Sequence, residues 1–295
     1  MGLATAPSQP LLIELSPEEL SSQRVGSHSL QAAVEGFHRG GLVVLKNAVE
    51  PAHLDRLNDR MVREAKELYA RETTHCNFGE DTGNIQQEPV VEPEYIFEDV
   101  IANPWATQVI ECMFGPNPES RFYSANAAFK ATGRQPVHID IGFDTPKVPF
   151  GYRININLVD TSPENDAAEI WLRSHTDTDR SVLDPDVSHK QIHSKLLEER
   201  RKLSPPIQPS LPKGALIIRE FRLWHAGMPN KTDEPRVMLV TVQFPQWYRS
   251  ELKIVLPKCL QGKINRARIV PKVEWVDEGY DYLKGAHDHD FRLKP

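Results

Sequence analysis

The sequence is poor in cysteine, in basic charge and in long apolar segments. Its three cysteines, Cys76, Cys112 and Cys259, are scattered and odd in number, which argues against a disulfide framework and favours a reducing compartment. A net charge of -6 argues against a nucleic-acid partner, because such proteins usually gather basic residues on one face. No stretch approaches the roughly eighteen apolar residues of a membrane span, and the first residues do not resemble a signal peptide. We therefore expect a cytoplasmic protein without nucleic-acid or membrane partners.

The first part of the chain predicts helices. Residues 1–28 are polar and interrupted by proline, so we expect an extended N-terminal segment there. A short helix within 29–41 should end at two glycines and lead into a strand. Apolar residues at helical spacing predict an amphipathic helix within 50–73, and a proline near its start predicts another within 103–115. Between these two helices, residues 75–95 predict a loop long enough to serve as a lid or a binding wall.

From residue 120 the pattern changes to strands. Short apolar or alternating runs, separated by glycine and proline clusters, continue to about residue 250, with a helical insertion at 188–203. Such runs predict a mainly β protein with flanking helices, a double-stranded β-helix of the jelly-roll, cupin-like kind. We expect the run at 236–244 to return antiparallel to the strand at 216–218. Residues 29–295 should then form a single domain with its jelly-roll core at about 120–250.

The stretch 135–143, QPVHIDIGF, places a histidine and an aspartate two residues apart in an apolar run. In a strand, residues two apart point to the same face, so His138 and Asp140 should face one point. His225 lies 85 residues after Asp140 and could supply a third ligand. Two imidazoles and one carboxylate are the ligand set of non-heme Fe(II) oxygenases, which leaves coordination positions open for other molecules.

Arg236 follows His225 by eleven residues, across a stretch rich in turn-forming residues. A hairpin-like return would bring its guanidinium alongside His225, where it could hold a carboxylate by two parallel hydrogen bonds. A dicarboxylate bound by Arg236 at one end and by the metal at the other has the shape of 2-oxoglutarate.

Together these residues resemble the phytanoyl-CoA dioxygenase (PhyH) family of Fe(II)/2-oxoglutarate-dependent oxygenases, over roughly residues 30–250. The resemblance implies Fe(II) on the three ligands, 2-oxoglutarate as co-substrate on Arg236, dioxygen as oxidant and ascorbate as a reductant in vitro. Gln135 matches a family glutamine that contacts 2-oxoglutarate. The chain looks most like the small fungal enzymes of secondary-metabolite biosynthesis, which implies a small-molecule substrate. Related small oxygenases are often homodimers.

Further residues are candidates for the co-substrate and substrate sites. Asn155 and Asn157 alternate with apolar residues, so they should line the barrel interior, where one could donate to the co-substrate. Side chains expected near the mouth of the barrel are candidate substrate contacts: Tyr123, Phe143, Trp171, Arg173 and Trp224. The pair His287 and His289 lies in a polar tail without apolar support, and we expect no metal site there.

One segment departs from the family pattern. Residues 157–178 resemble the stretch that usually reads N-G-A-T-E-I-W-P-G-T-H, but Asp166 replaces its first glycine and Leu172-Arg173 replaces its Pro-Gly. Aspartate tolerates a left-handed backbone moderately well, so Asp166 need not break the turn. Leu172-Arg173 should change the loop at the mouth of the site, and this bears on the identity of the substrate rather than on the metal.

Three other functions remain open at this stage. An acyl-CoA hydroxylase of the same family would want a basic patch for the CoA phosphates. A non-catalytic partner subunit on the same scaffold would usually have lost a ligand or the arginine. A cupin-like metal hydrolase or isomerase would not require Arg236. Consumption of 2-oxoglutarate with added Fe(II) would separate the oxygenases from the other two.

Overall fold

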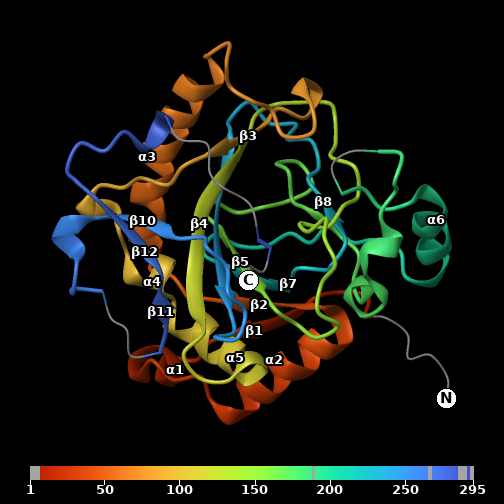
Figure 1. Cartoon of the computed structure of the whole chain (residues 1–295), viewed down its shortest axis with the longest axis horizontal. Helices are drawn as coiled ribbons and strands as arrows, with labels where there is room; N and C mark the ends of the chain where they lie inside the picture. Colours follow the sequence, from red (N-terminus) through yellow and green to blue (C-terminus); the bar gives the residue numbers. More distant parts are fainter. Residues whose placement is uncertain (1–6, 188–189, 265–267, 285–290, 293–295) are drawn as a thin grey trace.

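The computed structural model describes residues 7–187, 190–264, 268–284 and 291–292 (Figure 1). The α-helices are α1 (Pro17–Ser22), α2 (Ser27–Gly40), α3 (Pro51–Tyr69), α4 (Glu98–Ile101), α5 (Pro104–Phe114) and α6 (Ser194–Leu203). Short 3-10 helices lie at Glu80–Thr82, Pro93–Tyr95, Ser174–Asp177, Arg180–Val182, Lys258–Leu260 and Tyr282–Lys284. The tail that contains His287 and His289 lies outside the described residues.

A large mixed sheet forms the centre of the molecule. Its strands follow the order β1-β2-β7-β5-β9-β4-β11. β3 lies outside this order and pairs with β4. Two smaller pairs, β10-β12 and β6-β8, complete the strands. The bounds are β1 (Leu11–Glu14), β2 (Leu42–Lys46), β3 (Asn84–Gln87), β4 (Glu119–Ala128), β5 (Tyr152–Asn157), β6 (Glu169–Ile170), β7 (Leu216–Glu220), β8 (His225–Ala226), β9 (Arg236–Phe244), β10 (Ile254–Pro257), β11 (Val270–Pro271) and β12 (Val273–Val276). The expected fold class, a jelly-roll β core with flanking helices, is confirmed.

Local sequence signals account for where the helices begin and end. Asn103 caps α5 by accepting a hydrogen bond from the Ala106 amide at 2.9 Å, and Pro104 occupies the first turn, where its missing amide costs nothing. Gly41 ends α2 with a left-handed φ of 84° and leads directly into β2. The helices predicted within 29–41, 50–73 and 103–115 are thus confirmed.

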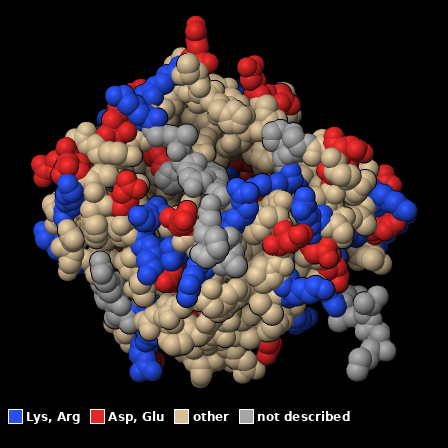
Figure 2. All heavy atoms as spheres, in the orientation of Figure 1, with Lys and Arg blue, Asp and Glu red and all other residues tan. Residues whose placement is uncertain are grey.

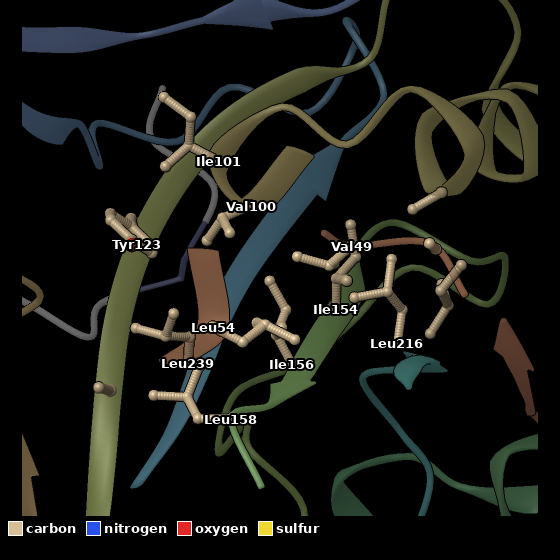
Figure 3. Packing of buried hydrophobic residues seen from close by; sticks show 14 of the residues in the cluster. Val49, Leu54, Val100, Ile101, Tyr123, Ile154, Ile156, Leu158, Leu216 and Leu239 are labelled. Atoms are coloured by element: carbon tan, nitrogen blue, oxygen red, sulfur yellow. The ribbon is translucent and has the colours of Figure 1, made fainter. Parts of the chain in front are cut away.

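The two faces of the sheet bury different residues. On one face, alternate side chains of the central strands, such as Ile154, Ile156 and Leu239, pack against Leu54 of α3 (Figure 3). Each such side chain contributes about 1.5–3 kcal/mol to folding when it is removed from water. On the other face, a second cluster rich in phenylalanine fills the space under the smaller layer, with Phe221 and Phe244 fully buried.

The second layer is built from short pairings rather than from long strands. It includes the β6-β8 pair and single bridges that join His138 to His225 and Thr161 to Leu211. In Figure 1 this layer, with β8, and the helix α6 lie on the side of the sheet away from α3. The space between the sheet and this layer is where the polar residues of β5 and β7 point.

Two expectations about strands are corrected by the structure. The stretch 135–143 is not a continuous strand, because only His138 within it forms bridges, to His225 and Gln191. Pro136 has no amide hydrogen to donate to the segment that contains His225. The next hydrogen bond to that segment runs from the Gln135 amide to the Gly227 carbonyl at 2.9 Å, which is one residue out of register with the His138–His225 bridge. The run at 236–244, which is β9, does not pair with β7, because β5 lies between them and pairs with both.

Two other segments contain more structure than their sequence indicated. The stretch through residue 28 holds β1, which pairs in parallel with β2, and the capped helix α1, so these residues extend the sheet instead of standing apart from it. The loop at 75–95 holds β3, which pairs with β4. The predicted insertion at 188–203 contains α6.

The surface agrees with the expected absence of a basic stripe on the face that can be seen. Lys and Arg side chains are interspersed with Asp and Glu side chains across the view in Figure 2. Among the described residues, no helix is long and apolar enough to cross a membrane.

Candidate metal centre and active-site cavity

Three side chains from two separate segments converge at one point of the second layer. One nitrogen each of His138 and His225 and one oxygen of Asp140 all lie within 4.8 Å of one another. The backbones of His138 and His225 are locked together, because each amide donates to the other carbonyl, at 2.9 and 3.1 Å. The predicted triad is therefore assembled, although a single bridge rather than a strand carries its first two members.

Main-chain carbonyls select the tautomer of both histidines. The Nδ1 of His138 lies 2.9 Å from the Pro136 carbonyl, and the Nδ1 of His225 lies 3.0 Å from the Leu223 carbonyl. A carbonyl only accepts, so Nδ1 carries the hydrogen and each Nε2 keeps its lone pair. Burial lowers the pKa of His138 to about 4, and burial together with Arg219 lowers the pKa of His225 well below its usual 6.5. Both rings are thus neutral at pH 7, the form that binds a metal.

The carboxylate of Asp140 faces in two directions. Its Oδ1 lies 3.7 Å from the Nε2 of His225, whereas its Oδ2 lies 3.2 Å from Arg153 and 2.9 Å from Arg219. Burial alone would raise the pKa of Asp140, but the two guanidiniums outweigh it and hold the pKa well below 3.8. Two neutral imidazoles and one ionised carboxylate on one face fit Fe(II), which these donors bind with open positions remaining.

A cavity of about 310 Å³ opens beside the three ligands. Of the residues predicted to bind metal or co-substrate, all seven line it: Gln135, His138, Asp140, Asn155, Asn157, His225 and Arg236. The loop at 75–95 contributes Asn77 and Phe78, and the Phe78 ring lies 4.6 Å from the His138 ring between centroids. One end of the predicted lid therefore touches a metal ligand.

Arg236 reaches the cavity through the turn that the sequence indicated. Asn230 is fully buried and holds this turn, since its amide nitrogen donates to the carbonyls of Ala128 at 2.8 Å and Glu234 at 2.9 Å. β9 then begins at Arg236, so the guanidinium enters the cavity that His225 also lines. Sequence reasoning recognised the turn but not the role of Asn230 in it.

Asp166 engages one edge of Arg236. It forms an ion pair with Nη2, and the same nitrogen donates to the Asp166 carbonyl at 3.1 Å. Burial raises the pKa of Asp166, and the attraction of Arg236 opposes this rise. The Nε of Arg236 is buried and has no hydrogen-bond partner among the described residues. Because Arg236 lines the cavity, its free Nε–H can donate to the carboxylate of 2-oxoglutarate.

The positions where the family carries glycine keep a left-handed backbone here. Asp166 has a φ of 65°, as its tolerance for this conformation predicted, and Arg173 has a φ of 64°. Arg173 adopts a conformation that glycine favours, and a change of this loop relative to the family stays a prediction. The Arg173 amide is fixed by a bond to the Gly40 carbonyl at 2.8 Å.

The other predicted co-substrate contacts keep part of their hydrogen-bonding capacity. Gln135 accepts a bond from the Gly227 amide at 3.0 Å through its Oε1, which leaves its amide nitrogen to donate. Asn155 approaches the Met238 sulfur at 3.1 Å with its nitrogen, while its buried Oδ1 has no partner among the described residues. Asn157 donates to Thr161 at 3.2 Å.

The five predicted substrate contacts do not line the cavity. Tyr123 points to the helix-covered face of β4, because Asn126, three residues further on, faces the cavity. Trp171 and Trp224 pack into the second apolar cluster, and the Trp224 Nε1 donates to Thr178. Phe143 packs on that cluster as well, and Arg173 lies in the loop described above. Four of these side chains pack into the apolar clusters, and none of the five lines the cavity.

Two arginines that the sequence reasoning missed lie at the metal site. Arg153 and Arg219 sit directly opposite each other on β5 and β7, with side chains 12% and 7% exposed. The nitrogens of Arg219 also lie 3.5 and 3.2 Å from the two ring nitrogens of His225. A signal was present in the sequence, because Arg153 belongs to the same alternating set as Asn155 and Asn157.

Several solved structures share the fold of this chain. SnoN, an epimerase crystallised with Fe3+, alpha-ketoglutarate and nogalamycin RO, is 17% identical, with a TM-score of 0.54 over 75% of this chain and 85% of its own. A second structure of SnoN, a non-heme alpha-ketoglutarate-dependent epimerase from nogalamycin biosynthesis, is 16% identical, with a TM-score of 0.55 over 75% of this chain and 82% of its own. AviO1 from Streptomyces viridochromogenes is 17% identical, with a TM-score of 0.53 over 75% of this chain and 97% of its own. At these identities the likeness establishes the fold.

The family itself comes from the sequence match. The model of the family described as phytanoyl-CoA dioxygenase (PhyH) matches residues 37–238, which is more than half of the 295 residues and includes the three metal ligands and Arg236. The chain therefore belongs to the phytanoyl-CoA dioxygenase (PhyH) family of iron- and 2-oxoglutarate-dependent oxygenases.

Proposed function

We propose that this protein oxidises a small organic metabolite with Fe(II), 2-oxoglutarate and dioxygen, in natural-product biosynthesis. The observation that carries the proposal is the meeting of His138, Asp140 and His225 in one cavity with a buried guanidinium, Arg236, that keeps a free donor. SnoN acts in the biosynthesis of nogalamycin, and its fold is shared with this chain. The proposed outcome for the substrate is hydroxylation, desaturation, epoxidation or ring closure.

In this proposal each residue has a distinct task. The three ligands hold Fe(II), which supplies the oxidising chemistry when it is bound with 2-oxoglutarate and dioxygen. Arg236 binds the carboxylate of 2-oxoglutarate that lies away from the metal, and Gln135, which lines the same cavity, donates to the co-substrate. Asn155 and Asn157 line the same space. The loop at 75–95 excludes water by covering the metal ligands with Phe78.

The direct test is conversion of 2-oxoglutarate to succinate and CO2 with added Fe(II) and ascorbate, with and without candidate metabolites. We expect turnover by the wild type and none by Asp140→Ala. The matched control is Asp233→Ala, which removes an exposed partner of Lys130 and should keep wild-type turnover. Full turnover by Asp140→Ala would remove the triad from its role.

The role of Arg236 has its own test. Arg236→Gln removes a charge-assisted hydrogen bond worth about 1.5–3 kcal/mol, so the KM for 2-oxoglutarate should rise about 10- to 100-fold. Arg268→Gln is the matched control, since Arg268 pairs with Glu111 on the surface and its side chain is 43% exposed. An unchanged KM in Arg236→Gln would contradict the assignment.

The proposed type of enzyme, oligomeric state, cellular location and domain bounds rest on the sequence alone. We propose a role like that of the small fungal secondary-metabolite enzymes. We also propose a homodimer in the cytoplasm, with residues 29–295 as one oxygenase domain. Mass spectrometry of reactions with candidate metabolites would identify the substrate and separate products that gain an oxygen atom (hydroxylation or epoxidation) from products that lose two hydrogens (desaturation or ring closure). NMR of the purified product would then distinguish the two members of each pair. Light scattering of the purified protein would give its oligomeric state.

A further inference from the structure

Two arginines beside the metal site lie directly opposite each other on neighbouring strands, an arrangement of like charges that is unfavourable in a sheet. Arg153 and Arg219 are register partners on β5 and β7, and both side chains point into the cavity. Like charges directly opposite on neighbouring strands destabilise a sheet unless something balances them. Asp140 contacts both, but one carboxylate balances one guanidinium. If the pair served only to hold Asp140, one arginine would be enough.

The charges that line the cavity do not cancel. Among the described residues, the cations with largely buried side chains are Arg153, Arg219 and Arg236, and the carboxylates are Asp140 and Asp166, which leaves one positive charge. Lys190 also lines the cavity, but it is exposed to solvent. Fe(II) and the doubly negative 2-oxoglutarate cancel each other, so loading the proposed site does not remove this surplus. A buried unbalanced charge costs several kcal/mol. A bound monoanion would remove that cost.

Arg153 also keeps an unused hydrogen-bond donor. The Nε of Arg153 lies 3.2 Å from Asp140 Oδ2 without the alignment of a hydrogen bond, and neither atom has another hydrogen-bond partner among the described residues. A guanidinium offers a planar fork that matches a carboxylate. One buried donor, the Nε of Arg153, is therefore available to an oxyanion beside the positive charge of Arg219.

Apolar surfaces adjoin this charged pair. The Cζ of Arg153 lies 5.5 Å from the ring centroid of Phe291 and 5.9 Å from that of Phe221. Other cavity-lining residues close to the sheet are apolar, such as Ile217 on β7. An organic acid has matching parts, because its carboxylate would meet the arginines and its carbon skeleton would meet these side chains.

We propose that Arg153 and Arg219 form a binding site for the carboxylate of the substrate, so that the enzyme acts on an organic monoacid. This inference rests on the proposed function, because it assumes that metal and co-substrate occupy the rest of the cavity. It identifies the chemical class of the substrate, which the ligand set alone does not. It also gives the arginine pair a role beside that of Arg236, which binds the co-substrate.

The test compares a small acid with its uncharged isostere. Protein loaded with Zn(II) and N-oxalylglycine, an inert analogue of 2-oxoglutarate, is titrated with 4-fluorobenzoate or 4-fluorobenzamide and followed by fluorine NMR. We expect the acid to bind at least about tenfold more tightly than the amide, as a buried charge-assisted hydrogen bond would give. Replacing Zn(II) by paramagnetic Co(II) should speed fluorine relaxation of the bound acid, which places it near the metal.

Variants decide where the acid binds. Arg153→Gln and Arg219→Gln should each abolish the preference for the acid, Arg153→Lys should retain part of it, and the surface control Arg268→Gln should keep all of it. Calorimetric titration with Zn(II) and N-oxalylglycine checks that each variant retains its metal and co-substrate sites. If Arg153→Gln fails that check, Arg153→Lys and Arg219→Gln still decide.

Three results would overturn the inference. The first is equal binding of acid and amide by the wild type. The second is a preference that survives in both glutamine variants. The third is a loss of N-oxalylglycine affinity in Arg219→Gln with the preference for the acid intact, which would assign the arginine to the co-substrate. If the wild type binds neither Zn(II) nor N-oxalylglycine, the proposed function fails instead, and this outcome is separate from the other three.

Discussion

Removing Asp140 should destabilise the metal-free protein, apart from any effect on catalysis. In Asp140→Ala, the guanidiniums of Arg153 and Arg219 lose the carboxylate that lies 3.2 and 2.9 Å away. Breaking a buried ion pair by deleting one partner costs about 3–5 kcal/mol, because the other charge stays buried and unpaired. An exposed pair is worth about 0–1 kcal/mol.

This cost converts to a measurable shift in melting temperature. The entropy of unfolding is roughly 2.1 cal/mol/K per residue, which gives about 0.6 kcal/mol/K for 295 residues. A loss of about 3–5 kcal/mol therefore lowers the Tm by about 5–8 °C. Differential scanning calorimetry in the presence of EDTA measures this shift without metal.

Two further variants identify its cause. Asp233→Ala deletes the partner of Lys130, where both side chains are largely exposed, and should lower the Tm by less than about 2 °C. Adding Arg219→Met to Asp140→Ala removes one of the stranded charges and should recover part of the loss. The reasoning is refuted if Asp140→Ala unfolds within about 1 kcal/mol of the wild type, or if Arg219→Met makes the double variant less stable still.

The other predictions concern a glycine stop, a buried histidine and the co-substrate wall. Burial, reinforced by Arg222 and Arg200, lowers the pKa of His175 to about 4, below the roughly 6.5 of an unfolded chain. The unfolded chain alone then takes up a proton on this residue between these values, so His175 should contribute about 3 kcal/mol to the fall in stability as pH falls from 6.5 to 4, and urea unfolding of His175→Asn should show a correspondingly smaller fall. Gly41→Ala should cost at least about 2 kcal/mol in the same assay, since its φ is 84° and the added Cβ would lie 2.5 Å from His175 Nδ1; a loss below 1 kcal/mol would contradict this. Gly227→Ala would set a Cβ 2.8 Å from the Gln135 side chain and should raise the KM for 2-oxoglutarate while calorimetric Zn(II) affinity stays unchanged.

The sequence predicted the metal ligands because their signal is local. His138 and Asp140 interrupt an apolar run with polar residues that such a run does not need, and His225 and Arg236 follow at an interval typical of the family. Their side chains converge even though residues 135–143 do not form the expected strand. The two segments are held together by one bridge between His138 and His225, and the alternation of side chains along a strand does not predict such a bridge.

The alternation with Asn155 and Asn157 could have placed Arg153 on the cavity wall, but its pairing with Arg219 could not be predicted because that signal is non-local. Arg153 and Arg219 are 66 residues apart, and they meet only because β5 lies between β7 and β9. The sequence had suggested that β9 pairs with β7, an arrangement that would have kept them apart. The residues predicted as substrate contacts do not line the cavity, for a related reason. Tyr123 has the chemistry of a pocket wall, but the parity of β4 turns it toward the helices.

The bonds that fix the two histidine tautomers have a consequence for how this enzyme changes over time. In both cases the acceptor is the carbonyl two residues earlier, at Pro136 and at Leu223, and not a neighbouring side chain. Substitutions on the cavity wall therefore leave the proton of each imidazole where it is. The protonation of the two imidazoles and the recognition of substrate are therefore separable traits. The apolar residues around the arginine pair can be exchanged for a new substrate without moving either imidazole proton, whereas Arg153 and Arg219 also hold Asp140.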